Sequence, residues 1–147
     1  MTLLEIDLKK LEHNYSSLRK RLNHHSKMIG VIKANAYGSL SGPIAKKLVD
    51  LGVEALAVAY AQEAVELREY GIKIPLMVFY PQVGSFGEII HHKIEPVLYS
   101  KRTWDKFKQA LRVEKKSTYP IHIKYNTGLN RVGFHPNETD WIMEQLK

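Results

Sequence analysis

The chain has 147 residues, of which 44% are hydrophobic and 25% charged, as is typical of one soluble domain with its own hydrophobic core. It has no cysteine, which excludes disulfides and thiolate metal sites, and no apolar run approaches the roughly 20 residues that span a bilayer. Basic residues spread along helical stretches produce the net charge of +7, and the N-terminus lacks the apolar centre of a signal peptide, so we expect a cytoplasmic protein without nucleic-acid or membrane partners.

The first two predicted elements are a helix and a strand. Apolar side chains recur at intervals of three and four over residues 7–22, which predicts an amphipathic helix with Asp7 as its N-cap. Residues 28–32 form a short continuous apolar run that ends at Lys33. Such a run favours a strand that is buried on both faces of a parallel sheet.

The remaining elements alternate along the chain. Gly52 and Gly71 end the first two of the later helices, and Pro96 weakens one strand because it removes a ladder donor. Asn137 or Thr139 is the start signal of the last helix. Helices are predicted at 43–51, 62–70, 86–91, 104–112 and 137–146, and strands at 55–59, 76–79, 95–98 and 121–125.

This alternation predicts an α/β fold built from parallel βαβ repeats, with about five strands. No linker divides the chain, so residues 1–147 are expected to form one domain. Two architectures fit the pattern. One is a doubly wound sheet. The other is a (β/α)8 TIM-type barrel, which takes about 250 residues and would be incomplete here.

Lys33 is the first candidate for chemistry. It follows an apolar strand and precedes a loop with Gly38, and the carboxyl ends of strands are where parallel α/β proteins place their sites. Partial desolvation favours a neutral amine, which is the form that makes a Schiff base with an aldehyde. Position alone also allows a lysine that merely ends a strand and reaches solvent, and Tyr37 could be an ordinary packed aromatic residue.

The second candidate lies in residues 121–134, again a strand followed by a turn of small and polar residues. Arg131 in this turn is expected on the same face as Lys33. Its guanidinium can donate two parallel hydrogen bonds to a carboxylate or a phenolic oxygen. An ordinary surface arginine paired with a nearby acid is the competing interpretation.

Four blocks of the chain carry a family resemblance. Residues 31–38, with the sequence VIKANAYG, are similar to the cofactor-lysine motif of the alanine racemases. Residues 5–15, 57–68 and 124–134 resemble further blocks of that family, in the family's order. The resemblance implies a TIM-type barrel that uses pyridoxal 5'-phosphate (PLP), an isomerase of fold type III.

The same resemblance assigns roles to single residues. Lys33 matches the lysine that binds PLP and then acts as acid and base at the substrate Cα. Tyr37 matches a tyrosine near the cofactor phosphate. Arg131 matches an arginine that bonds the cofactor's phenolic oxygen and holds the substrate carboxylate. Lys124 matches a lysine that is carbamylated in some members, where it orients that arginine. No metal is implied.

Two segments depart from the family pattern. Asn126 stands where the family commonly has an aspartate, which changes the charge balance around Arg131. After Gly38, Ser39 and Leu40 replace a histidine and a glycine.

Length is the largest departure, because family members are more than twice as long. They complete the barrel and add a β-rich domain that brings a second base, a tyrosine, across a homodimer interface. The last residues fall inside a helix pattern, so we expect a fragment of a parent enzyme. The parent would interconvert L- and D-alanine for cell-wall peptidoglycan, while the isolated chain would be inactive.

Three alternatives stay open. The chain could be a non-catalytic PLP-binding barrel of PLP homeostasis, part of a racemase for another amino acid, or a basic nucleic-acid-binding domain. Whichever holds, an incomplete barrel leaves open sheet edges and exposed apolar surface, which self-association could cover.

Overall fold

The computed structural model describes residues 2–146. Its centre is a five-stranded sheet in which every neighbouring pair is parallel and the spatial order β1-β2-β3-β4-β5 follows the chain. The strands are β1 (Ile29–Val31), β2 (Ala55–Val58), β3 (Leu76–Val78), β4 (Glu95–Leu98) and β5 (His122–Ile123). The helices are α1 (Leu8–Arg19), α2 (Lys33–Gly38), α3 (Ser41–Asp50), α4 (Ala61–Glu69), α5 (Phe86–His91), α6 (Lys101–Val113) and α7 (Thr139–Gln145).

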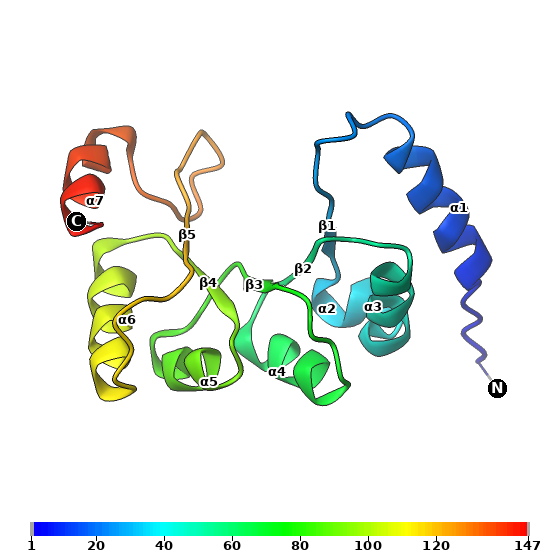
Figure 1. The fold of residues 1–147 in the computed structure, drawn as a ribbon, viewed down its shortest axis with the longest axis horizontal. Coiled ribbons are helices and arrows are strands. Elements are labelled where there is room, and N and C mark those ends of the chain that lie inside the picture. The colour runs from blue at the N-terminus through cyan, green and yellow to red at the C-terminus, as the bar shows by residue number, and fades with distance from the viewer. Residues whose placement is uncertain (1, 147) are drawn as a thin grey trace.

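Helices α3, α4, α5 and α6 follow one another along one side of the sheet, in the same sequence as the strands (Figure 1). The opposite side carries no such layer, and α1 and α7 stand at its two ends. A doubly wound sheet would reverse its strand order and place helices on both faces. The arrangement is therefore that of an incomplete (β/α)8 barrel, as the sequence analysis expected.

The two faces of the sheet differ in burial. The side chains that face the helices form the core, and those of Leu56, Val58, Leu76 and Val78 have no exposed surface. On the other face burial varies: Ile29 is 49% and Val31 is 39% exposed on the edge strand, whereas Ala57 and Val97 on inner strands are buried. The expectation that the first strand is buried on both faces is therefore wrong, because no element among the described residues covers this side. We call it the concave face.

The register shows which residues share the concave face. Val31 pairs with Ala57, Ala57 with Met77, and Met77 with Glu95. Side chains of paired residues point to the same face of a sheet, and residues two positions apart along a strand do so too. The concave face thus carries Ile29, Val31, Ala55, Ala57, Met77, Glu95, Val97 and His122.

Several predicted boundaries shift. Asp7 is the N-cap of α1 as expected and accepts hydrogen bonds from Lys9 N and Lys10 N, but the helix ends three residues before Leu22. Helix α6 begins at Lys101 rather than at 104, because the Ser100 side chain accepts from the third helical N–H and caps it. Helix α3 begins at 41 rather than 43. Strand β5 is shorter than predicted, and a 3-10 turn (Pro136–Glu138) precedes α7, which excludes Asn137 as its start.

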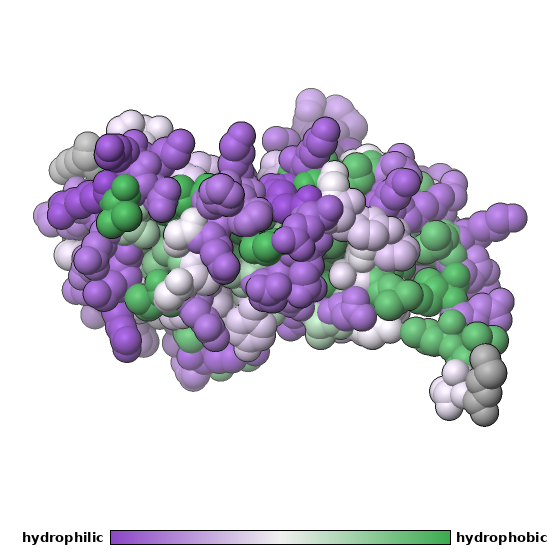
Figure 2. Space-filling model, turned by 90° about the horizontal axis from the view of Figure 1, so that it is seen from below, coloured by the Kyte–Doolittle hydropathy of each residue, from purple (hydrophilic) through white to green (hydrophobic). Residues whose placement is uncertain are grey.

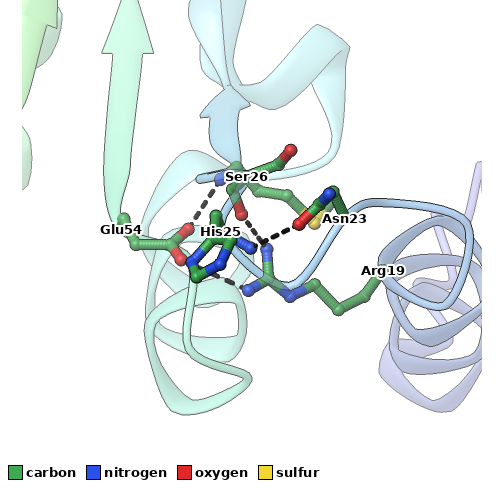
Figure 3. Close-up of polar contacts among 6 residues, drawn as sticks. Arg19, Asn23, His25, Ser26 and Glu54 are labelled. Atoms are coloured by element: carbon green, nitrogen blue, oxygen red, sulfur yellow. Dashed lines mark hydrogen bonds and ion pairs between the residues drawn. The ribbon is translucent and has the colours of Figure 1, made fainter.

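The connection between α1 and the sheet is held by a polar network (Figure 3). Arg19 Nη1 donates to Ser26 O at 2.6 Å, and Arg19 Nη2 lies 3.7 Å from Glu54 Oε1. The other oxygen of Glu54 accepts from Met28 N at 2.6 Å. Glu54, which directly precedes β2, therefore ties both α1 and the entry to β1 to the second strand.

A half-buried guanidinium holds the amino-terminal end of the sheet. Arg68 donates to the carbonyl oxygens of Ile72 and Ile74 at 2.8 Å, and to those of His92 and Lys93 at 3.0 Å. These carbonyls belong to the segments that follow α4 and α5. Arg68 thereby fixes the entries to β3 and β4, and Gly71, with φ of 96°, caps α4 as predicted.

The outer surface of the helical layer is mainly hydrophilic, with apolar residues scattered among polar ones (Figure 2). This distribution is the usual one for helices that bury one stripe against a sheet. Within residues 2–146, no helix combines the length and the hydropathy needed to cross a membrane.

Candidate active site

The sheet places Lys33 and Lys124 at the carboxyl ends of its two edge strands. Lys33 comes two residues after Val31 of β1, and Lys124 follows β5 directly, where its N–H extends the ladder to Leu98 O at 3.0 Å. Both lysines are half-buried. Lys124 is two residues beyond His122 and so continues the concave face. The two lysines thus stand at one rim of that face.

The segment after Lys33 has an uncommon backbone. Ala34, Asn35, Ala36 and Tyr37 have φ between 52° and 55° and ψ between 38° and 52°, so α2 is one turn of left-handed helix. Each such residue costs ~1–2 kcal/mol relative to a right-handed conformation, and four in a row store on the order of 4–8 kcal/mol. The sequence predicts only a glycine-containing loop here. The surrounding structure must compensate for this strain.

Three contacts outside the peptide geometry itself hold the turn. Ser41 N donates to Asn35 Oδ1 at 2.8 Å, and Ala36 is buried. Ala34 N donates to Glu63 Oε1 at 2.5 Å. Tyr37, by contrast, is 66% exposed, so its ring points away from the core and is free to face a ligand.

Glu63 is a residue that the sequence analysis missed. It lies in the first turn of α4, and its second oxygen accepts from Ala59 N at 2.8 Å and from Tyr60 N at 2.9 Å. A glutamate in the first turn of a predicted helix is a recognisable capping signal. Its reach to the loop after β1 is a tertiary contact that no local pattern reveals.

The loop 124–134 is closed on itself. Asn126 N donates to Phe134 O and Phe134 N donates to Lys124 O, both at 2.8 Å. Inside the loop, Asn126 Oδ1 accepts from Gly128 N at 3.2 Å and from Asn130 N at 2.9 Å. These bonds need only a side-chain oxygen. Asparagine can therefore make the same two contacts that an aspartate could make here, without adding a negative charge.

Arg131 lies in this loop and is exposed. Its guanidinium carbon stands 5.0 Å from the centroid of the Tyr80 ring, in a cation–π contact. Tyr80 follows β3, so the contact brings the loop after β5 over the carboxyl end of the central strand. Within the described residues, Arg131 has no carboxylate partner at ion-pair distance, which removes the interpretation that it serves a surface ion pair.

An acid–imidazole pair lies deeper on the concave face. His122 Nε2 is 2.8 Å from Glu95 Oε2, across the β4–β5 pair. Near the rim, burial raises the pKa of Tyr99, whose hydroxyl donates to Pro81 O at 3.3 Å. No sequence pattern marks these groups, because strand register and loop contacts bring them together.

The residue set fits an anionic aldehyde cofactor. Lys33 offers a primary amine with no ion pair to a described residue, and Arg131 and Lys124 offer positive charge at the same rim. No hydrogen bond joins Lys33, Tyr37, Lys124 and Arg131 to one another. A cavity of about 380 Å³ lined by Leu98, Trp104 and Phe107 among others includes none of these four residues. The candidate site is therefore the rim of the concave face.

Comparison with known proteins adds independent information. Residues 6–147 match the family described as Alanine racemase, N-terminal domain. The chain is 39% identical over 135 residues to alanine racemase 1 of Clostridium acetobutylicum, covering 91% of this chain and 34% of that protein. It is 32% identical over 151 residues to the alanine racemase of Sorangium cellulosum, covering 99% and 40%.

Solved structures agree with the fold. The alanine racemase of Clostridium difficile 630 superimposes with a TM-score of 0.93 at 33% identity, over 100% of this chain and 40% of that one. The complex of that enzyme with cycloserine gives a TM-score of 0.89 at 34% identity, over 95% and 39%. The chain thus spans between 34% and 40% of the length of these relatives.

Proposed function

This chain belongs to the alanine racemase family, matching its N-terminal domain, and from that premise we propose that it supplies the PLP-binding half of an alanine racemase active site. The observation that carries the proposal is the placement of Lys33. It lies inside the VIKANAYG motif, at the carboxyl end of β1, on the same rim as Lys124 and Arg131.

Bound PLP would supply an electron sink that spreads the negative charge left when a proton is removed from the substrate Cα. Lys33 would hold the cofactor through its amine and, once released from it, remove or return a proton on one face of Cα. Arg131 would donate to the cofactor's phenolic oxygen and attract the substrate carboxylate. Tyr37 would lie near the phosphate.

Lys124 would act through its charge. As an ammonium beside Arg131 it is favourable only when an anion lies between the two cations, and carbamylation would provide that anion within the side chain itself. Asn126 leaves this balance without a local carboxylate.

The whole enzyme's activity extends the proposal. Family membership suggests that the whole enzyme interconverts L- and D-alanine and supplies D-alanine for peptidoglycan. It also suggests a cytoplasmic location and a homodimer. A racemase needs a base on each face of Cα, and Lys33 accounts for one of them. We therefore expect the 147-residue chain by itself not to racemise alanine at a useful rate.

The test is PLP binding to the purified chain. Addition of PLP should produce a visible absorbance band, and borohydride should fix the cofactor to Lys33, as found by peptide mass spectrometry. Lys33→Ala should abolish the band, whereas Lys73→Ala, at an exposed lysine after α4, should leave it unchanged. An equal band in Lys33→Ala would refute the assignment. Rapid racemisation by the chain alone would refute the expectation that it lacks a base on the second face of Cα.

A further inference from the structure

The hydrogen-bond ladder between β1 and β2 stops directly before Lys33. Its last bond runs from Ile32 N to Ala57 O at 2.9 Å. In a parallel ladder, the next step would use the N–H groups of Ala59 and Ala34 as donors. Neither donates to the opposite strand, although the two strands are still adjacent at this point.

Both N–H groups are bound by one carboxylate. Glu63 accepts from Ala34 through Oε1 at 2.5 Å and from Ala59 through Oε2 at 2.8 Å. Glu63 therefore takes the place of the strand carbonyls that the ladder would have used. Of the two carbonyls that the ladder would have used, Ile32 O receives Ala36 N at 2.9 Å, which closes the left-handed turn, and Ala59 O receives Tyr80 N at 2.9 Å.

The charge of Glu63 is balanced by N–H groups. Within residues 2–146 no cation lies at ion-pair distance from its carboxylate. It accepts three hydrogen bonds, the third from Tyr60 N, and it lies in the first turn of α4, where the helix dipole favours negative charge. Bonds to an ionised acceptor are stronger than neutral ones, so this carboxylate is suited to hold a strained backbone.

The Ala34 N–H belongs to the peptide group that directly follows Lys33. Fixing that peptide plane fixes the rotation about the Cα–C bond of Lys33, and hence the direction in which its side chain leaves the backbone. We propose that Glu63 is a positioning residue, which ends the β1–β2 ladder at Lys33 and sets the direction in which the Lys33 side chain leaves the backbone at the rim. The inference rests on the proposed function only in taking PLP as the partner of Lys33.

Two variants of the full chain separate this role from helix capping. Glu63→Gln removes the charge and turns one acceptor into a donor, so it cannot satisfy both Ala34 and Ala59. Glu63→Asp keeps the charge near the N-terminus of α4 but is one methylene shorter, so it should retain Tyr60 N and lose Ala34 N. The control is Glu66→Gln, an exposed glutamate on the same helix whose carboxylate contacts Gln62 Nε2 at 3.3 Å.

The first measurement is amide hydrogen exchange by NMR without cofactor. We expect the Ala34 amide to exchange about tenfold or more faster in both Glu63 variants, while the Tyr60 amide of Glu63→Asp keeps the wild-type rate. Glu66→Gln should match the wild type at both sites. Unchanged Ala34 exchange in a folded Glu63 variant would overturn the inference, and Glu63→Asp decides it if Glu63→Gln does not fold.

The second measurement is the pH profile of Lys33 labelling by trinitrobenzenesulfonate, read by peptide mass spectrometry. The profile of Lys33 should move in both Glu63 variants while that of Lys73 stays fixed, and PLP fixed to Lys33 by borohydride should fall about tenfold. If the Glu63 variants matched the wild type in Lys33 labelling and in PLP uptake, the positioning role of Glu63 would be contradicted. If the wild type takes up no PLP at Lys33, the proposed function fails, and exchange and labelling still decide the role of Glu63.

Discussion

Gly133 shows how one residue can determine a loop of the candidate site. Its φ is 137°, and a Cβ there would lie 2.5 Å from Asn126 N and 2.6 Å from Tyr125 C. These atoms belong to the backbone of the bridge that closes the loop, so they cannot rotate away as a side chain would. We expect Gly133→Ala to lower the free energy of unfolding by about 2–4 kcal/mol, measured by urea denaturation.

Gly128 is the matched control in the same loop. Its φ is 129°, but nothing lies within 4 Å of a Cβ added there. Gly128→Ala should therefore cost only the backbone strain, about 1–2 kcal/mol. Equal losses in the two variants would show that strain alone, and not crowding of the bridge, makes Gly133 necessary.

The residues of the site were predictable to different degrees. Lys33 stood out because it follows an apolar strand, and its motif gave it a role. The left-handed turn after Lys33 could not be predicted, since of its four residues only Asn35 is of a type that favours positive φ. The role of Glu63 depends on a contact 29 residues away along the chain, which requires the fold to be known.

Glu54 links three elements and gives the fold a dependence on acid. The hydrogen bond from Met28 N, aided by Arg19, holds the pKa of Glu54 below its ordinary value of 4.5. A lowered pKa in the folded state stabilises the fold above the unfolded pKa, and this contribution is lost as pH falls through the folded value. We expect Glu54→Gln to lower stability near neutral pH and to flatten its fall below about pH 4.5.

Chemical denaturation at several pH values measures this effect. Glu69→Gln, at an exposed glutamate at the end of α4, should follow the wild-type acid dependence. If Glu54→Gln kept the same slope as the wild type below pH 4.5, the network of Figure 3 would not be the origin of the acid dependence.

At the scale of elements, the spacing of apolar residues and the glycines at helix ends located every strand. The exact ends of the elements depended on capping and bridging contacts. The predicted strand 121–125 shortens to β5 because the backbone at Lys124 and Asn126 pairs with Phe134 to close its own loop. Ser100 caps α6 three residues earlier than apolar spacing indicated. Apolar spacing reports which face is buried, whereas caps and bridges determine where an element stops.

At the scale of the molecule, periodicity could not separate a doubly wound sheet from part of a barrel. In both architectures helices pack against one face of each strand. The two differ in strand order and in what covers the second face of the sheet. The motif resemblance favoured the barrel, and the order β1 to β5 with helices on one side confirmed it. A second-face residue such as Val31 reads as core in the sequence, yet it is 39% exposed.

The open concave face and the two edge strands should make the 147-residue chain associate. Ile29, 49% exposed on edge strand β1, combines an apolar side chain with an unpaired strand edge. Sedimentation equilibrium should show an average mass that rises with protein concentration, and Ile29→Lys should weaken association about tenfold or more. Val113→Lys adds the same charge at a valine 72% exposed at the end of α6. Equal weakening by both variants would mean that net charge, and not the concave face, controls association.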